Sequence, residues 1–269
     1  MDEEQRHRDA EVLAAQYSDS ADGYAEFWSP VIRPVGRRLL AALPWDRATR
    51  VLDVGTGTGA LVRDIEAHAP TARVLGIDRS VGMLRLASPE RSHLVLMDAM
   101  SLGLRDSSVD VAVMAFMLFH LPDPVLAFTG IHRVLRSHGA VGVVTWVDDP
   151  LTTAEKVWDE ELDAAGAPAA ERPPRFHELM NTPEKLTGLL EKAGFTITRV
   201  WLERIEHRWD PARLVGLRTR YGASKGRLDA LDPDARAALL DRARIRIGRL
   251  SADDFLYRAV TVCAVAKRA

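Results

Sequence analysis

Short apolar runs alternate with amphipathic stretches between about residues 50 and 147. The fourth run is continuous and apolar, which is typical of a strand covered on both faces. The predicted strands span residues 51–54, 74–77, 94–97, 109–116 and 141–146. The predicted helices between them span residues 60–69, 81–87 and 124–136. Strands separated by helices of this length predict a parallel α/β sheet with right-handed crossovers.

The alternation breaks after residue 147. A helix is predicted from Thr182-Pro183 to Gly194, another begins at Asp232-Pro233, and residues 195–204 and 255–265 have the pattern of strands. We therefore predict one doubly wound α/β domain over residues 1–269. Its expected parts are a core at 46–147, a C-terminal part of the sheet at 182–205 and 255–269, and covers over the ligand-binding edge at 1–45, 148–181 and 206–254.

Composition and charge are those of an ordinary globular protein. The 269 residues carry a net charge of −2, which excludes the global positive charge of a dedicated nucleic-acid binder. A single cysteine, Cys263, excludes an internal disulfide and a cysteine-based zinc cage. The longest apolar run, residues 111–119, is half of the roughly 18 residues that a membrane span needs. These features predict a cytoplasmic protein with neither a nucleic acid nor a membrane as its partner.

A glycine turn follows the first predicted strand. Asp53 is followed by Gly55-x-Gly57-x-Gly59, and Asp78 ends the second strand, 19 residues after the last glycine. Ligands of open parallel sheets bind at the carboxyl ends of the strands, and glycines there let the backbone approach a ligand closely. An acid at this spacing can accept hydrogen bonds from the two hydroxyls of a ribose.

The charges at this edge discriminate between cofactors. Asp53, Asp78 and Asp98 follow three strands that should be neighbours, and a diphosphate would be repelled by three carboxylates. They suit a ligand that is cationic or rich in N–H donors, such as S-adenosylmethionine with its sulfonium, ammonium and adenine amino groups. A nicotinamide dinucleotide remains the alternative, because the turn also fits the pattern G-x-G-x-x-A.

At this point the residues resemble a family. VLDVGTGTG at 51–59, GIDRSVGML at 76–84, Asp98-Ala99, the stretch 116–124 and the turn at 134–140 look like motifs of class I S-adenosylmethionine-dependent methyltransferases. The resemblance covers about residues 46–147 and is closest to the small-molecule branch typified by quinone-biosynthesis C-methyltransferases. It implies a Rossmann-like methyltransferase fold with seven strands, the last pair antiparallel. One departure is Phe119-His120, where the family often has two histidines.

The resemblance also implies a cofactor site. The residues it assigns are Asp53, Gly55, Thr56, Gly57, Asp78, Arg79, Met83, Asp98, Ala99 and Phe116. By the resemblance, Gly55 and Gly57 contact the methionine part of the cofactor, and the Phe116 carbonyl accepts from its ammonium group. Asp78 binds the ribose. Arg79 and Met83 flank the adenine, Asp98 accepts from the adenine amino group, and Ala99 faces the ring.

Methyl transfer is an in-line displacement that chiefly needs alignment and desolvation, and some acceptors also need a base. His120, just past the fourth strand, and Tyr24, in the N-terminal cover, are the candidate catalytic residues; each is alternatively a packing residue. Trp28, Trp146 and His177 are candidate substrate-binding residues, with core packing or a solvated loop as the alternatives. The apolar run after strand four argues against a metal and for an aromatic or lipophilic acceptor.

Residues 204–250 are strongly basic. They hold twelve basic and six acidic residues, an excess of six positive charges in a chain whose net charge is −2. The excess is either a solvated helix surface or a basic rim for an anionic acceptor.

We predict methyl transfer from S-adenosylmethionine to an oxygen atom of a small organic acceptor, with carbon or nitrogen as the alternative, and with secondary metabolism as its setting. A homodimer is possible. The alternatives are a cofactor-binding protein repurposed for a non-methylating reaction such as a cyclisation, and a nicotinamide-dependent oxidoreductase.

Overall fold

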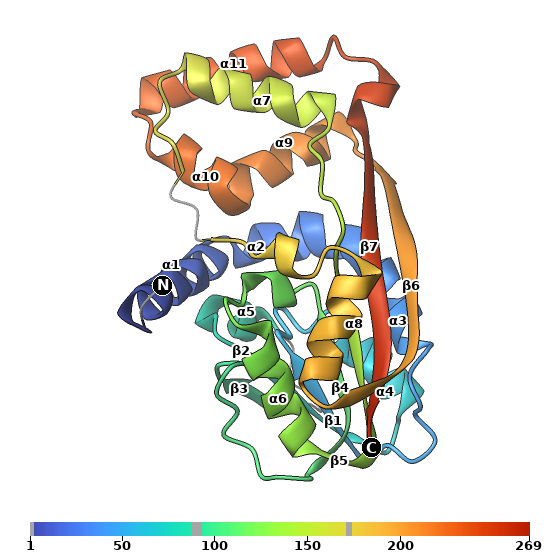
Figure 1. The fold of residues 1–269 in the computed structure, drawn as a ribbon. Helices are drawn as coiled ribbons and strands as arrows, with labels where there is room; N and C mark the ends of the chain where they lie inside the picture. The colour runs from blue at the N-terminus through green and yellow to red at the C-terminus, as the bar shows by residue number, and fades with distance from the viewer. Residues whose placement is uncertain (1–2, 88–92, 171–173) are drawn as a thin grey trace.

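Seven strands form one mixed sheet in the order β3-β2-β1-β4-β5-β7-β6 (Figure 1). This is a computed structural model that describes residues 3–87, 93–170 and 174–269. Only β7 runs antiparallel, to both β5 and β6, so the predicted sheet and its antiparallel end are confirmed. The strands are β1 Arg50–Val54, β2 Arg73–Asp78, β3 His93–Leu96, β4 Val109–Ala115, β5 Leu135–Trp146, β6 Phe195–Arg208 and β7 Leu256–Arg268.

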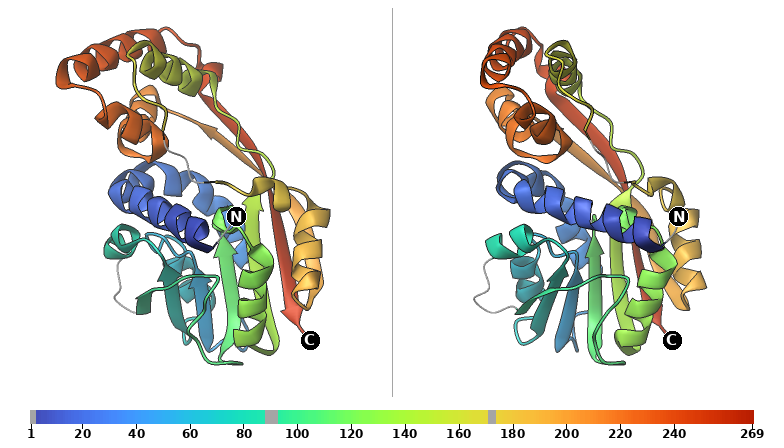
Figure 2. Two further views of the ribbon diagram at one scale, coloured as in Figure 1. Left: turned by 60° about the vertical axis from the view of Figure 1, so that its left-hand side comes forward. Right: turned by 90° about the vertical axis from the view of Figure 1, so that its left-hand side faces the viewer.

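Helices cover both faces of the sheet. On one face α3 contacts α4, and on the other α6 contacts α8 (Figure 2). The α-helices are α1 Glu3–Asp19, α2 Ala21–Gly23, α3 Ser29–Leu40, α4 Val62–His68, α5 Val81–Leu86, α6 Pro124–Val134, α7 Thr153–Ala164, α8 Pro183–Lys192, α9 Pro211–Arg220, α10 Gly222–Asp229 and α11 Pro233–Ile247. The π-helical segment η1 spans Tyr24–Trp28, and 3-10 turns are η2 Leu118–His120, η3 His177–Leu179 and η4 Ala252–Phe255. In the described parts of the chain no helix is both long and apolar enough to span a bilayer.

Four helices begin with the same local chemistry. In α6, α8, α9 and α11 a proline follows an Asp or Thr whose side chain accepts a hydrogen bond from a backbone N–H of the first turn. Proline fixes the backbone angle and lacks the N–H that would be unpaired there, so these starts could be predicted from the sequence.

The predicted end of α6 and start of β5 are wrong. The helix ends at Val134, and β5 starts at Leu135 rather than at residue 141. Leu135 pairs with Val109, a bulge follows, and His138 has a left-handed φ of 66°. Pairing with β4 thus overrides the helical pattern of residues 135–136. Similarly α4 starts at Val62, because Gly59 has a φ of 71° and a turn precedes the helix.

The predicted cover at residues 1–45 is only partly a cover. Val35, Leu39 and Leu40 of α3 are fully buried, and α3 packs against β5, β6 and α4 rather than over the carboxyl edge. Only α1, α2 and η1 lie between the sheet and the upper helices (Figure 1).

The upper helices are carried on a two-stranded extension of the sheet. β7 pairs with β5 only from Lys267 to Thr261, whereas its pairing with β6 continues to Leu256 opposite Arg208. Beyond this ribbon lie α7, α9, α10 and α11 (Figures 1 and 2). They belong to the predicted covers 148–181 and 206–254, of which residues 171–173 lie outside the described ranges. Cys263 of β7 is fully buried, and burial raises its thiol pKa to about 12, as expected of an inert core residue.

Ion pairs account for most of the basic segment 204–250. α7 supplies five acids that pair with arginines of this segment: Glu155 and Asp159 with Arg218, Glu160 and Glu161 with Arg246, Glu161 with Arg242, and Asp163 with Arg227. Asp19 and Glu26, from the N-terminal helices, pair with Lys225 and Arg220. Ion pairs of this segment therefore hold the upper helices, α7, α9, α10 and α11, to one another and to the N-terminal helices.

Gly82 tests how closely α1 must sit on α5. A Cβ at Gly82 would lie 2.5 Å from backbone atoms of Ser18, whereas one at Gly188 in α8 would meet nothing within 4 Å. We expect Gly82→Ala to lower the free energy of unfolding by about 1–3 kcal/mol and to speed amide exchange in α1. Gly188→Ala should instead leave stability unchanged or raise it by up to about 1 kcal/mol. Equal effects in thermal unfolding and hydrogen exchange would contradict the close α1–α5 contact.

Candidate functional site

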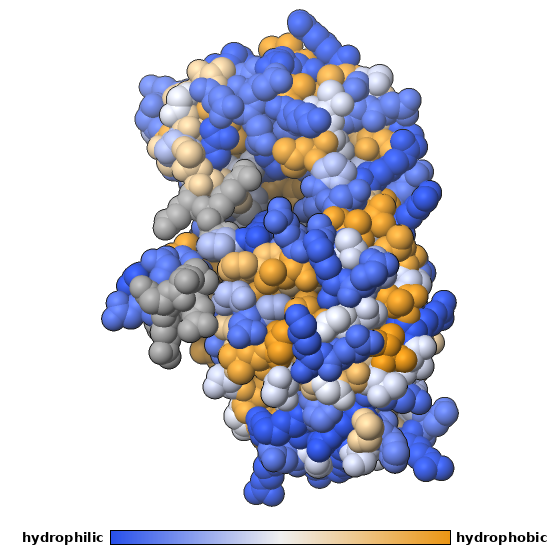
Figure 3. All heavy atoms as spheres, in the orientation of Figure 1, coloured by the Kyte–Doolittle hydropathy of each residue, from blue (hydrophilic) through white to orange (hydrophobic). Residues whose placement is uncertain are grey.

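A cavity of about 560 Å³ opens at the carboxyl ends of the strands. Its walls come from the loops after β1, β2 and β4, from α1 and η1, from residues 174–176 and from the junction of α9 and α10. In the space-filling view, apolar side chains gather at mid-height of this face (Figure 3). The volume is typical of a pocket for a small molecule or cofactor.

The glycine turn presents bare backbone to this cavity. Gly55 and Thr56 donate their backbone N–H groups to the Ile77 carbonyl, at 2.8 and 3.0 Å, which fixes the turn against the end of β2. Gly55 has a φ of 70°, and a Cβ there would lie 2.7 Å from the Met117 side chain. Gly57 has a φ of 56° and only the Tyr24 ring, at 4.0 Å, near its Cβ position. A ligand can therefore approach the backbone at Gly57.

Asp78, the last residue of β2, lines the cavity at the edge of the sheet. Its two carboxylate oxygens accept hydrogen bonds from the backbone N–H groups of Gly57, at 2.9 Å, and Ser80, at 2.8 Å. Burial raises the pKa of this carboxyl, and these backbone hydrogen bonds oppose the shift. A carboxylate offers about four acceptor positions, so Asp78 retains acceptors for a diol such as a ribose.

The other two acids of the predicted trio do not line this cavity. Asp53 is buried, accepts the Thr56 hydroxyl at 2.7 Å, and has its pKa raised to about 6 by burial. Together with Thr56 it lines a smaller cavity behind the turn. Asp98 accepts the Met100 N–H at 2.9 Å and lies 3.9 Å from Arg79. Local polar groups thus hold these two carboxylates outside the lining of this cavity, and the contact of all three acids with one ligand stays a prediction.

Most of the predicted cofactor residues do meet in the cavity. Those that line it are Gly55, Gly57, Asp78, Arg79, Met83, Ala99 and Phe116. Phe116 has a φ of 56°, which is rare for a residue with a side chain and is typical of functional sites. Its strained backbone directs the chain from β4 into η2.

Aromatic side chains form the wall next to Phe116. Trp28 lies 6.2 Å from Trp146 and stacks on Trp209 at 6.4 Å between ring centroids, and Phe116 lies 4.9 Å from Trp146. Trp28 and Trp146 line the cavity and also pack against the hydrophobic core, and their binding of a substrate stays a prediction.

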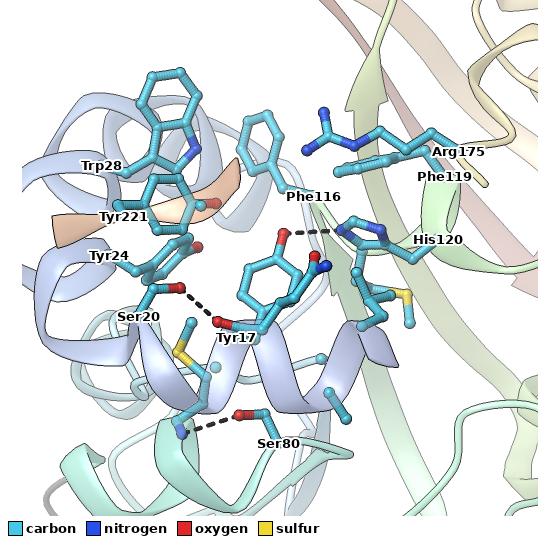
Figure 4. Close-up of a pocket in the computed structure, with 18 of the residues that line it drawn as sticks. Tyr17, Ser20, Tyr24, Trp28, Ser80, Phe116, Phe119, His120, Arg175 and Tyr221 are labelled. Atoms are coloured by element: carbon cyan, nitrogen blue, oxygen red, sulfur yellow. Dashed lines mark hydrogen bonds between the residues drawn. The ribbon is translucent and has the colours of Figure 1, made fainter. Parts of the chain in front are cut away.

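His120 forms a pair with Tyr17. The Tyr17 hydroxyl and His120 Nε2 are 2.9 Å apart, and both residues line the cavity (Figure 4). Burial, with the charges of Arg175 and His177, lowers the pKa of His120 to about 3, so the ring is neutral at pH 7. His120 Nδ1 is buried without a hydrogen-bond partner among the described residues.

His177, a predicted substrate residue, does not line the cavity. Its ring stacks on Phe119, with centroids 4.4 Å apart and planes 13° from parallel. This stacking holds it away from the space in front of His120.

Three lining residues, Tyr17, Tyr221 and Arg175, are not predicted from the sequence, because no motif or spacing marks them. Tyr17, Tyr24 and Tyr221 form a cluster whose ring centroids are 5.5–6.4 Å apart, yet only Tyr24 is predicted as a site residue. Tyr221 lies between α9 and α10, some 200 residues from the other two, so no spacing links them. Arg175, which lines the cavity as Arg79 and Arg218 do, lies in an irregular segment that has no recognisable motif.

Comparisons with known proteins agree with this architecture. Residues 52–143 match the family model described as "Methyltransferase domain". An O-methyltransferase of Aspergillus nomiae, rstn1, is 32% identical over 178 residues, which cover 61% of this chain and 70% of that relative. This chain belongs to the class I S-adenosylmethionine-dependent methyltransferases. Membership in this family, whose cofactor is S-adenosylmethionine, argues against the nicotinamide-dependent oxidoreductase.

Other relatives of this methyltransferase match over shorter spans. A malonyl-[acyl-carrier protein] O-methyltransferase of Marinomonas sp. is 32% identical over 52% of this chain and 53% of the relative. A demethylmenaquinone methyltransferase of Staphylococcus aureus is 36% identical over 39% of this chain and 46% of the relative. The chain thus spans about half the length of these two relatives.

Solved structures share the fold. An S-adenosylmethionine-dependent methyltransferase of Archaeoglobus fulgidus aligns with a TM-score of 0.51 and 16% identity over 89% of this chain and 94% of that one. The [4+2]-cyclase SpnF aligns with a TM-score of 0.54 and 22% identity over 87% of this chain and 80% of that one.

Replacement of Asp78 tests its role in the cavity. Because Asp78→Asn replaces one acceptor oxygen by a donor amide, we expect S-adenosylhomocysteine to bind at least 10-fold more weakly in calorimetry. Asp241→Asn, on the surface of α11, is the control and should bind like the wild type. Equal affinities for the wild type and Asp78→Asn would show that Asp78 does not hold the nucleoside.

The low pKa of His120 predicts a pH dependence of stability. The unfolded chain takes up a proton on His120 below about pH 6.5 and the folded one only near pH 3, so folding loses stability as the pH falls. Between pH 7 and pH 5 the free energy of unfolding, measured in urea, should therefore fall by about 1–2 kcal/mol less in His120→Gln than in the wild type. His93→Gln, at an exposed histidine of β3, should behave as the wild type does. Identical losses in His120→Gln and wild type would contradict a buried neutral ring.

Proposed function

We propose that this protein transfers a methyl group from S-adenosylmethionine to an oxygen atom of a small organic acceptor with an aromatic or lipophilic body. The observation that supports this most strongly is one cavity lined by two kinds of groups. Asp78 and the bare backbone of Gly57 suit a nucleoside, and the Tyr17–His120 pair and Trp28 offer hydrogen-bonding and apolar side chains to an acceptor.

The residues at the sheet edge fit the cofactor. When bound, S-adenosylmethionine supplies an electrophilic methyl group on a sulfonium sulfur. We propose that Asp78 accepts from the ribose hydroxyls and that the Phe116 carbonyl accepts from the ammonium group. Arg79, Met83 and Ala99 would enclose the adenine, and Asp98 would accept from its amino group after turning from Arg79. The protein then contributes alignment and removal of water.

The His120 side chain is better suited to hydrogen bonding with the acceptor than to acting as a general base. A general base works best with a pKa near the working pH, whereas burial lowers the pKa of His120 to about 3. Burial also raises the pKa of the Tyr24 hydroxyl, which therefore stays protonated. We propose that the Tyr17–His120 pair and Tyr24 orient the acceptor through hydrogen bonds, while Trp28 and Trp146 contact its apolar body.

Two relatives support oxygen as the methylated atom. The proteins from Marinomonas and Aspergillus are both named O-methyltransferases. A small-molecule acceptor also agrees with the volume of the cavity, about 560 Å³. The cytoplasmic location and the homodimer stay predictions.

Thermal unfolding with ligands tests the proposed function. Because a ligand at 100 times its Kd adds about 2.7 kcal/mol of stability, S-adenosylhomocysteine should raise Tm by several degrees and NAD should not. Incubation with methyl-labelled S-adenosylmethionine and a panel of lipophilic acids and phenols should then yield labelled product. Cofactor binding without transfer to any acceptor would favour the non-methylating alternative, and no binding would reject the proposal.

A further inference from the structure

One cation in the cavity lacks a counter-charge. Of the three arginines that line it, Arg79 lies 3.9 Å from Asp98, and Arg218 pairs with Asp159 and Glu155. For Arg175 no ion pair occurs within the described residues, 3–87, 93–170 and 174–269. An arginine facing a ligand pocket with no acidic partner is a candidate for pairing with an anionic ligand.

The local structure holds Arg175 at this position. The backbone N–H of the next residue, Phe176, donates to the Phe119 carbonyl at 2.8 Å and ties the segment to η2. The guanidinium carbon lies 5.8 Å from the centre of the Phe119 ring. In the close-up, the Arg175 side chain extends toward the space between Phe116 and the Tyr17–His120 pair (Figure 4).

The neighbouring groups are neutral hydrogen-bonding groups. Tyr17 and Tyr221 lie near enough for the charge of Arg175 to affect their pKa values, and His120 is neutral. One guanidinium beside phenolic hydroxyls forms a set that suits a bound oxyanion.

Asp149 and Glu155, two acids that line the cavity, already have hydrogen-bond or ion-pair partners. Asp149 accepts the Tyr257 hydroxyl at 2.6 Å. Glu155 accepts from Thr152 at the start of α7 and lies 3.9 Å from Arg218. Asp9, a further acid of the lining, accepts a hydrogen bond from Gln5 at 2.7 Å. Among the described residues none of these acids forms an ion pair with Arg175, so its charge remains available to a ligand.

We propose that Arg175 binds a carboxylate of the acceptor, and that the substrates of this enzyme are carboxylic acids on an aromatic or lipophilic body, which it converts to methyl esters. This inference rests on the proposed function and narrows its substrate class. Arg175 is thereby a specificity-determining residue.

The chemistry of a carboxylate matches the groups in the cavity. A carboxylic acid with a pKa near 4 is ionised at pH 7, so its oxygen needs no general base. A carboxylate oxygen forms a bond to the methyl carbon while the methyl–sulfur bond breaks, and the electron pair of that bond goes to sulfur. No proton moves. The ester is neutral and no longer pairs with Arg175, which favours its release.

Other acceptors fit the same groups less well. A phenol must lose a proton, and the neutral His120 is a weak base. A protonated amine would meet the like charge of Arg175. These contrasts make the preference for acids measurable.

Binding to the enzyme loaded with S-adenosylhomocysteine tests this inference. The probes are 2-naphthoate, 3-phenylpropionate and decanoate, each compared by calorimetry with the amide of the same skeleton. We expect at least one acid to bind the wild type 10-fold or more tightly than its amide. Arg175→Gln should reduce this ratio to below about threefold, and Arg175→Lys, which keeps the charge, should retain part of it. Arg249→Gln, at an exposed arginine in the turn after α11, is the matched control and should keep the full ratio.

The outcomes separate the two proposals. Intact binding of S-adenosylhomocysteine with no preference for any acid, or a preference that survives in Arg175→Gln, would overturn the inference and leave the proposed function in place. Failure of the wild type to bind S-adenosylhomocysteine would overturn the proposed function and this inference with it. Unchanged affinity of Arg175→Gln for S-adenosylhomocysteine is the control for correct folding.

Discussion

The hydrogen bond from the Gly57 N–H to the Asp78 carboxylate links the turn after β1 to the end of β2. It exists because Gly57 adopts a left-handed conformation and leaves its backbone uncovered. The same bond fixes the carboxylate while sparing some of its acceptor positions. The shape of the ligand-binding edge depends on it, since β1 and β2 are paired in register up to this point.

The cavity is lined by side chains of both charges. Asp78 lies among backbone donors at the sheet edge, whereas Arg175 lies among tyrosines and the neutral His120. Elsewhere the upper helices place their many arginines against the acids of α7 and the N-terminal helices. Because most of those charges are paired within the protein, Arg175 differs from them as an arginine of the cavity lining with no ion pair among the described residues.

The sequence is informative where a local rule decides the structure. Glycines that need a left-handed backbone, proline after a capping Asp or Thr, and apolar strands predicted the sheet and placed Asp78 correctly. It fails where the choice of a contact partner decides the structure. Asp53 accepts the nearby Thr56 hydroxyl, β5 starts early through pairing with β4, and Arg175 and Tyr221 reach the site only through the folding of the covers.

A crystal structure with bound S-adenosylhomocysteine tests the central claim most directly. We expect both ribose hydroxyls within about 3 Å of the Asp78 carboxylate, which is hydrogen-bond distance, and the sulfur directed toward the Tyr17–His120 pair and Arg175. A ribose bound away from Asp78, or a sulfur that faces away from that pair, would contradict the account.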